Sequence, residues 1–385
     1  MRGYKKLGLS PGVHTVTHAD KCLKRRHARG TKAREPSTKR KRLENKKDRT
    51  TSQGAKEALE GDMYQSGIGH EENVDTETIP DPIPKANFKP VKVNGEPTVI
   101  TFDLETTGLI EGRVLPQITQ IAATELKSGS EFQTYIKPTI EIGREASDIT
   151  GIAMVNGEMT VNGEVVKSVP LKSGIEQFIT WVSRFRNVCL IAHNGRRFDF
   201  PILVSILRKG GNLEKISTCA FIDSMSVFRK LYSKQSLKQV DLVSTLLGET
   251  YDAHNAIADV VALGKLVQFE KLPAGDLMAH SFSPRAVSMN MDFNNAKALN
   301  LPSLSPLVSA GIFKRPTAEN IAGSGLQLVH LKTLHSRGGE DAIRDVFKMN
   351  NSEGLPRVSS NKKVLEDVVP KIALYFENQQ ANSFN

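Results

Sequence analysis

Two carboxylates at the end of one apolar run have types and spacing that suggest chemistry. Asp103 and Glu105 follow Pro97-Thr-Val-Ile-Thr-Phe102, a run of β-branched and aromatic residues typical of a buried strand. Residues i and i+2 of a strand point to one face, so both carboxylates should face the same space. Close carboxylates repel each other unless a cation lies between them, and an all-oxygen set favours Mg²⁺ or Mn²⁺. Taken alone, such a pair is more often a turn at the end of a strand than a metal site.

Two more acids and a histidine occupy comparable positions. Asp199 precedes an expected helix over 200–209, shortly after a strand-like run over 188–192. Asp259 lies five residues after His254. This spacing places the histidine in the loop before an expected helix over 255–268, and the acid within the first turns of that helix.

The elements around these residues predict an α/β fold. Strands followed by alternating strands and helices are typical of a mixed sheet flanked by helices. The Asn-Gly pairs at 156–157 and 162–163 predict tight turns in a surface insertion. The expected strands cover 97–103, 118–124, 132–136, 188–192 and 218–222, and the other expected helices cover 172–186, 224–231, 236–247, 317–334, 339–348 and 360–377.

Charge is distributed unevenly along the chain. Residues 1–50 carry 17 Lys and Arg against four acids, whereas the remainder carries 35 basic and 38 acidic residues. A basic segment without apolar periodicity cannot offset its chain entropy and is expected to stay unfolded. Its clusters, Lys24-Arg25-Arg26 and Lys39-Arg40-Lys41-Arg42, indicate nuclear targeting or weak polyanion binding. A merely solvating tail and a cytoplasmic location are the alternatives.

Composition divides the chain into four expected segments. A disordered basic tail over 1–50 and a polar, proline-containing linker over 51–94 precede a region over 95–270 that holds all four acids. A helical extension over 271–385 follows, without identifiable chemistry. No apolar run approaches the ~20 residues that cross a bilayer, so a membrane protein is excluded and no membrane partner is expected.

Three motifs contain the candidate residues in order. They are Phe102-Asp-Leu-Glu-Thr-Thr-Gly-Leu109, His193-Asn-Gly-Arg-Arg-Phe-Asp-Phe-Pro-Ile-Leu203 and His254-Asn-Ala-Ile-Ala-Asp259. They resemble the motifs of the DEDDh, or DnaQ-like, 3′→5′ exonucleases of ribonuclease H-like fold, over roughly residues 97–270. The second motif is similar to that of the animal three-prime repair exonucleases, although their proline-rich loop and C-terminal membrane anchor are not evident. The implied fold is a mixed five-stranded sheet flanked by helices.

The C-terminal part carries a second resemblance. Ala322-Gly-Ser-Gly-Leu326, Arg337-Gly-Gly339 and Pro356-Arg-Val358 resemble the exonuclease-like C-terminal region of the promyelocytic leukaemia protein. The active-site acids of that protein are degraded, whereas all four are present here.

The first resemblance implies roles for individual residues. Asp103 would bridge two Mg²⁺ ions, for which Mn²⁺ can substitute, and Glu105 and Asp259 would complete the site of the water-activating ion. Asp199 would hold the second ion, and His254 would be the general base, a role for which imidazole side chains are suited near neutral pH. Substrate contacts are expected from the loop after the first strand and from the second motif, namely Thr106, Thr107, Leu109, Asn194 and Arg197.

The implied function is hydrolysis of nucleic acid from a free 3′ end, releasing nucleoside 5′-monophosphates, with DNA favoured over RNA as the partner. An exoribonuclease of the same chemistry and a non-catalytic nucleic-acid or chromatin scaffold are the alternatives. The full set of acids argues against a scaffold, because a scaffold has no need of crowded like charges. The sequence leaves a homodimer open.

Overall fold

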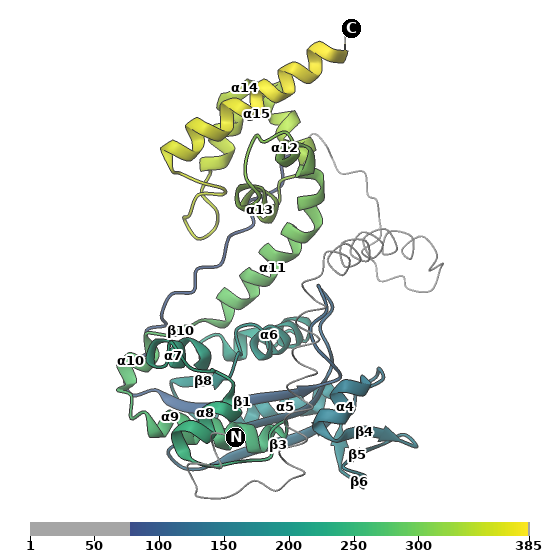
Figure 1. Ribbon diagram of the computed structural model, residues 1–385, viewed down its shortest axis with the longest axis vertical. Helices are drawn as coiled ribbons and strands as arrows, with labels where there is room; N and C mark the ends of the chain where they lie inside the picture. The colour runs from purple at the N-terminus through teal and green to yellow at the C-terminus, as the bar shows by residue number, and fades with distance from the viewer. Residues whose placement is uncertain (1–77, 384–385) are drawn as a thin grey trace, which may run out of the picture. The chain divides into compact units, whose positions relative to one another are not determined.

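The computed structural model describes residues 78–383, with side chains up to residue 379 (Figure 1). The predicted basic tail over 1–50 and most of the predicted linker over 51–94 therefore lie outside the described residues. Across the described range, none of the helices combines the length and the apolar character that crossing a membrane requires.

A mixed sheet holds the site. Its strands lie in the order β10-β9-β8-β1-β2-β3-β7. β1 pairs antiparallel with β2 and parallel with β8; β2–β3 is antiparallel and β8–β9 parallel. The five longer strands confirm the ribonuclease H-like sheet, and two short strands extend it to seven, so the expected count of five was too small. The bounds are β1 Thr98–Thr106, β2 Ile118–Glu125, β3 Glu131–Ile136, β7 Ser168–Val169, β8 Val188–Ala192, β9 Ala220–Asp223 and β10 Ser281–Phe282.

Helices cover both faces of this sheet (Figure 1). Successive side chains of β8 point to opposite faces of the sheet. Leu190 packs with α5 and α6 residues in one apolar cluster, and Ile191 packs with α7, α8 and α9 residues in another. A strand buried on both faces reads as a continuous apolar run, which is why β8 was predictable. The helices are α5 Leu171–Val182, α6 Asp199–Lys209, α7 Ser224–Leu231, α8 Gln239–Leu242 and α9 Ala256–Phe269.

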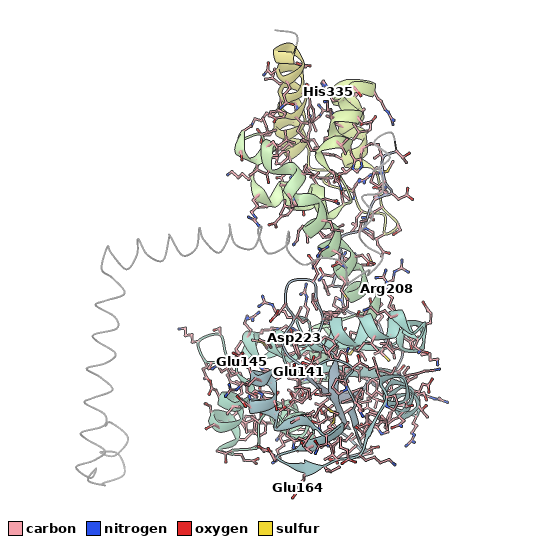
Figure 2. All side chains as sticks on the ribbon, turned by 90° about the vertical axis from the view of Figure 1, so that its right-hand side faces the viewer. Glu141, Glu145, Glu164, Arg208, Asp223 and His335 are labelled. Carbon is pink, nitrogen blue, oxygen red and sulfur yellow. The ribbon has the colours of Figure 1, made fainter. Side chains whose placement is uncertain are left out.

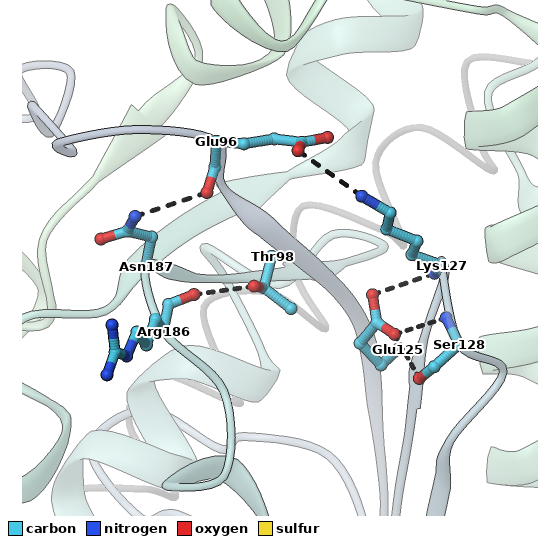
Figure 3. A network of polar contacts seen from close by, with 7 residues as sticks. All are labelled: Glu96, Thr98, Glu125, Lys127, Ser128, Arg186 and Asn187. Carbon is cyan, nitrogen blue, oxygen red and sulfur yellow. Dashed lines mark hydrogen bonds and ion pairs between the residues drawn. The ribbon is translucent and has the colours of Figure 1, made fainter.

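Polar contacts fix the end of β1 that lies away from its acids (Figure 3). The Thr98 hydroxyl donates to the Arg186 carbonyl at 2.7 Å, and Lys127 lies 3.6 Å from the Glu96 carboxylate. Glu125, the last residue of β2, accepts from the backbone N–H groups of Lys127 and Ser128 at 2.9 and 2.6 Å. These contacts anchor β1 and β2 at one end while the acids occupy the other.

A small hairpin insertion follows β3. It contains α4 (Arg144–Thr150), which the sequence did not predict, and the strands β4 (Ile152–Val155), β5 (Glu158–Val161) and β6 (Glu164–Val165). Asn156 and Asn162 have φ angles of 50° and 51°, and each is followed by a glycine with positive φ. This left-handed geometry confirms the two predicted Asn-Gly turns.

The C-terminal region is helical, as expected, but its helix boundaries differ. The single helix predicted over 317–334 is wrong, because Ser324–Gln327 separate α13 from α14 and Gly325 has a φ of 94°. The helix predicted over 236–247 starts at Gln239 and continues as a π-helical turn, η2 (Val243–Leu247). The remaining bounds are α10 Ala274–Met278, α11 Pro284–Asn300, η3 Leu301–Leu304, α12 Ser305–Ser309, α13 Arg315–Gly323, α14 Leu328–Lys348 and α15 Lys362–Ser383.

Residues 79–93, here called the strap, have no helix or strand but pack against folded residues. Ile83 N–H donates to the Ser324 carbonyl at 3.2 Å, and Val91 N–H donates to Ser281 Oγ at 2.8 Å. Phe88 packs edge-on to Phe282, with ring centroids 5.3 Å apart. The described part of the predicted linker therefore contributes side chains to the cores on either side of it.

Candidate metal and nuclease site

Carboxylates from three elements converge at the end of β1. Oxygen atoms of Asp103 and Glu105 on β1 and of Asp259 on α9 all lie within 4.8 Å of one another. Asp199, the first residue of α6, is 2% exposed and accepts a hydrogen bond from Leu104 N–H at 3.1 Å. Leu104 lies between Asp103 and Glu105, so the structure brings together all four acids that the sequence singled out.

Burial dominates the electrostatics of these acids. Burial, together with a smaller contribution from nearby carboxylates, raises the pKa of Asp103 well above its usual value and that of Glu105 to about 8. Burial also raises the pKa of Asp199 to about 7. Burial also raises the pKa of Asp259, and the hydrogen bond from Tyr251, which lowers this pKa, offsets only part of the rise. Four such groups cannot all ionise without compensating positive charge.

The donor set therefore fits a divalent cation. The three converging donors are carboxylate oxygens of half-buried side chains, and a positive ion placed between them relieves their mutual repulsion. Hard cations such as Mg²⁺ and Mn²⁺ prefer such oxygen ligands.

His254 lies in the loop before α9 in a left-handed conformation, with φ 69°. For a residue other than glycine this backbone costs about 1 kcal/mol or more. Its N–H donates to Asp259 Oδ2 at 2.8 Å, which ties the strained turn to the acid. The side chain is exposed.

The predicted substrate residues divide into two groups. Thr106 and Thr107 are buried, and their hydroxyls brace the loop: Thr106 Oγ1 donates to the Gly108 carbonyl at 2.7 Å, and Thr107 Oγ1 accepts from Gln117 N–H at 3.1 Å. Leu109, by contrast, is 74% exposed. Of these loop side chains, Leu109 is the one free to contact a ligand.

The second motif forms a turn before α6. Asn194 has a φ of 59°, and its carbonyl accepts from Arg197 N–H at 3.0 Å. Arg197 is exposed. The guanidinium of Arg196 lies 3.6 Å from the ring centroid of Phe88, so it stacks on the strap, a contact that the sequence did not predict.

Asp223 is a further buried acid that sequence reasoning missed (Figure 2). It ends β9, accepts from Arg196 N–H at 3.3 Å and from Met225 N–H at 3.0 Å, and thereby caps α7. Its charge contributes to raising the pKa of Asp199, after burial. The signal was available, since Asp223 also stands between an expected strand and an expected helix.

Two polar side chains beside Asp259 also escaped prediction. Gln239 and Tyr251 both donate to Asp259 Oδ1, at 3.1 and 2.8 Å. No local pattern distinguished them, because Asp259 lies 20 and 8 residues away in the sequence. His193, the first residue of the second motif, had no predicted role, and its Nδ1 lies 2.8 Å from Ser224 Oγ.

Comparison with known proteins gives two family matches. Residues 100–267 match the family described as Exonuclease, and residues 300–379 match the family described as PML, C-terminal domain. The second match overlaps the segments that resembled the promyelocytic leukaemia protein.

Three curated relatives are similar to this chain. It is 32% identical over 215 residues to "Exonuclease DPD1, chloroplastic/mitochondrial" of Arabidopsis thaliana, covering 51% of this chain and 65% of that protein. It is 30% identical over 190 residues to DNA polymerase III subunit epsilon of Buchnera aphidicola, covering 45% of this chain and 74% of that protein. A PolC-type DNA polymerase III of Thermotoga maritima is 28% identical over 168 residues, 43% of this chain and 11% of the polymerase. The chain thus spans less than two thirds of the first and third of these relatives.

Among solved structures, an exonuclease I structure is 20% identical, covers 57% of this chain and 47% of its own, and has a TM-score of 0.39. E. coli exonuclease I in complex with an oligonucleotide is 19% identical, covers 57% of this chain and 47% of its own, and has a TM-score of 0.38.

Proposed function

This chain belongs to the DnaQ-like exonuclease family, and from that premise we propose that it is a metal-dependent 3′→5′ exonuclease that degrades DNA and releases nucleoside 5′-monophosphates. Family membership by itself makes it a nuclease that hydrolyses nucleic acid. The observation that carries the finer proposal is the convergence of Asp103, Glu105 and Asp259, with Asp199 bonded to the backbone between the first two.

The four acids would hold two divalent ions. When bound, these ions supply positive charge for the attacking and leaving oxygens of a phosphodiester. His254 accepts the proton of the attacking water. The hydrogen bond from its N–H to Asp259 holds the loop before α9 in place. Exposed Leu109 packs beside the terminal base, so preference among bases should be weak.

DNA is the proposed substrate because two of the relatives are named as DNA polymerase III proteins. An exoribonuclease of the same chemistry remains the alternative, because the acids themselves do not distinguish the two sugars.

A cleavage assay tests this proposal. Oligonucleotides of DNA and RNA, labelled at the 5′ end, are incubated with Mg²⁺, Mn²⁺ or EDTA. We expect the 5′-labelled strands to give a ladder of products that shorten from the 3′ end. A strand labelled at its 3′ end should release a labelled mononucleotide first. No cleavage is expected in EDTA. Asp199→Asn should be inactive and the exposed control Asp148→Asn active. Internal cuts, release from the 5′ end, or full activity in EDTA would refute the proposal.

We also propose that residues 95–270 are the catalytic domain and that residues 1–50 direct the protein to the nucleus, on the strength of their basic clusters. A fusion to a bulky fluorescent reporter that prevents passive entry is expected to accumulate in nuclei. The same fusion without residues 1–50 should remain outside while still cleaving oligonucleotides. Nuclear accumulation of the truncated fusion would overturn the targeting proposal.

A further inference from the structure

We propose that Gln239 and Tyr251 are positioning residues that occupy one carboxylate oxygen of Asp259 and leave only the other for a divalent ion. This inference rests on the proposed function, because Asp259 is one of the proposed metal ligands. It assigns the metal affinity of the site in part to two side chains outside the three motifs.

The hydrogen bonds around Asp259 account for nearly all of its acceptor capacity. The Tyr251 hydroxyl donates to Oδ1 at 2.8 Å, and Gln239 Nε2 donates to the same oxygen at 3.1 Å. A carboxylate oxygen has two lone-pair positions, so Oδ1 is filled. His254 N–H takes one position on Oδ2 at 2.8 Å. One lone pair of Oδ2 is left, which is enough for one bond to a cation.

Gln239 and Tyr251 also hold each other and the start of α9. Gln239 Nε2 lies 3.1 Å from the Tyr251 oxygen and donates at 2.9 Å to the backbone carbonyl of Asp259. An amide that contacts both the side chain and the backbone of one residue fixes the torsion between them. The name "clamp" is used below for Gln239 and Tyr251 together.

The clamp is built into the fold. Gln239 is 9% exposed and begins α8, while Tyr251 packs against the same apolar cluster as Leu237 and Leu242. His193 of the second motif bonds to Ser224 Oγ at 2.8 Å and to the backbone of Leu237, two residues before Gln239. The second motif thus supports the segment that carries the clamp.

Without the clamp, Asp259 should rotate and lose part of its metal affinity. A carboxylate freed at Oδ1 can turn about its last torsion and exchange its two oxygens. Binding of the ion must then offset the entropy that the carboxylate loses when it becomes ordered. Loss of a hydrogen-bonding partner of a metal ligand typically costs 10–100-fold in metal affinity or activity. One of the two donors to Oδ1 remains when the other is removed, so we expect Mn²⁺ binding to weaken only about tenfold when either donor is removed singly.

The test measures Mn²⁺ binding to the full chain without substrate, by calorimetry or by electron paramagnetic resonance of the free ion. Tyr251→Phe removes one donor and Gln239→Met removes the other at similar volume. Each should raise the Kd for Mn²⁺ about tenfold and leave thermal unfolding in EDTA near that of the parent. Cleavage by both variants should recover toward the parental kcat at saturating Mn²⁺.

Matched controls remove the same groups elsewhere in the chain. Tyr232→Phe deletes a hydroxyl that bonds to Glu270, and Gln268→Met deletes an amide that donates to the Leu126 carbonyl at 3.1 Å. Neither acceptor is one of the four acids, so both controls should bind Mn²⁺ as the parent does. Asp259→Asn should not recover at high Mn²⁺.

The outcomes separate the two levels of the proposal. A parent protein that neither binds Mn²⁺ nor cleaves would overturn the proposed function itself. A parent that does both, with an unchanged Kd in Tyr251→Phe and Gln239→Met, would overturn the clamp alone. A lowered melting temperature with an unchanged Kd would make the two residues structural and would also overturn it. Tyr251→Phe deletes a single oxygen and keeps the ring, so the answer does not depend on Gln239→Met folding.

Discussion

The metal-free protein should lose stability as the pH rises through neutrality, and Glu105→Gln should remove much of that loss. Burial, reinforced by Asp259 and Asp199, raises the pKa of Glu105 from 4.5 to about 8. A carboxyl group whose pKa is higher in the folded than in the unfolded state binds its proton more tightly when folded. Its contribution to stability is therefore fully present below pH 4.5 and is lost as the pH rises through 8.

The size of this effect follows from the pKa change of Glu105. Each pKa unit corresponds to about 1.4 kcal/mol, so the change from 4.5 to about 8 sets a ceiling near 5 kcal/mol. The four acids share protons, and protonation of Asp103 relieves part of the repulsion on Glu105, which lowers the figure. We expect Glu105→Gln to be about 1–3 kcal/mol more stable than the parent above pH 8 and about equal to it near pH 5.

Urea unfolding in EDTA, followed by circular dichroism across this pH range, measures the effect. The exposed Glu145→Gln on α4 is the matched control and should follow the parent at every pH (Figure 2). Added Mn²⁺ should stabilise the parent most at high pH, where the acids are free of protons. Parallel stability curves for the parent and Glu105→Gln would refute the claim that burial and the neighbouring carboxylates raise the pKa of Glu105.

Three further outcomes are expected. Asp103→Ala should abolish cleavage while unfolding in EDTA at the parental temperature or slightly higher, because a repelling charge is gone; unfolding on substitution would instead make the residue structural. His254→Ala should lower the single-turnover cleavage rate by about 10²–10⁴-fold, with DNA binding retained; a rate near that of the parent would exclude it as the base. Phe88→Ala should cost about 1–3 kcal/mol in urea unfolding, because Phe88 packs in the core and under Arg196. Phe88→Leu keeps most of the burial but loses the ring, so it should cost only about 1 kcal/mol, and no cost at all in Phe88→Leu would mean that the stacking contributes nothing.

The parts of the fold that could be predicted from sequence are those with a local pattern. β1 and β8 are continuous apolar runs because they are buried on both faces, and the structure places both where they were expected. The two Asn-Gly turns were predictable because a two-residue hairpin loop needs positive φ. The four acids were found because each stands at a strand end or in the first turns of a helix, within an ordered set of motifs.

The rest depends on contacts that have no local signature. β7 and β10 are two residues long and form only where a neighbouring strand offers an edge. α11 carries a start signal, with Ser283 accepting from Ala286 N–H and Pro284 as its first residue, but no apolar stripe marks its length. Gln239 looks like any polar residue at the start of a helix, and its role depends on Asp259, twenty residues later.

The way each acid is held differs between the strand and the helices. Asp103 and Glu105 belong to β1, whose pairing with β2 runs through both residues and fixes their directions through the backbone. Asp199 and Asp259 begin or follow helix starts, where a side chain turns more freely. Both are held by specific donors: Leu104 N–H donates to Asp199, and the clamp donates to Asp259. The fold thus orders all four carboxylates before any ion arrives, and their repulsion becomes binding energy for a cation.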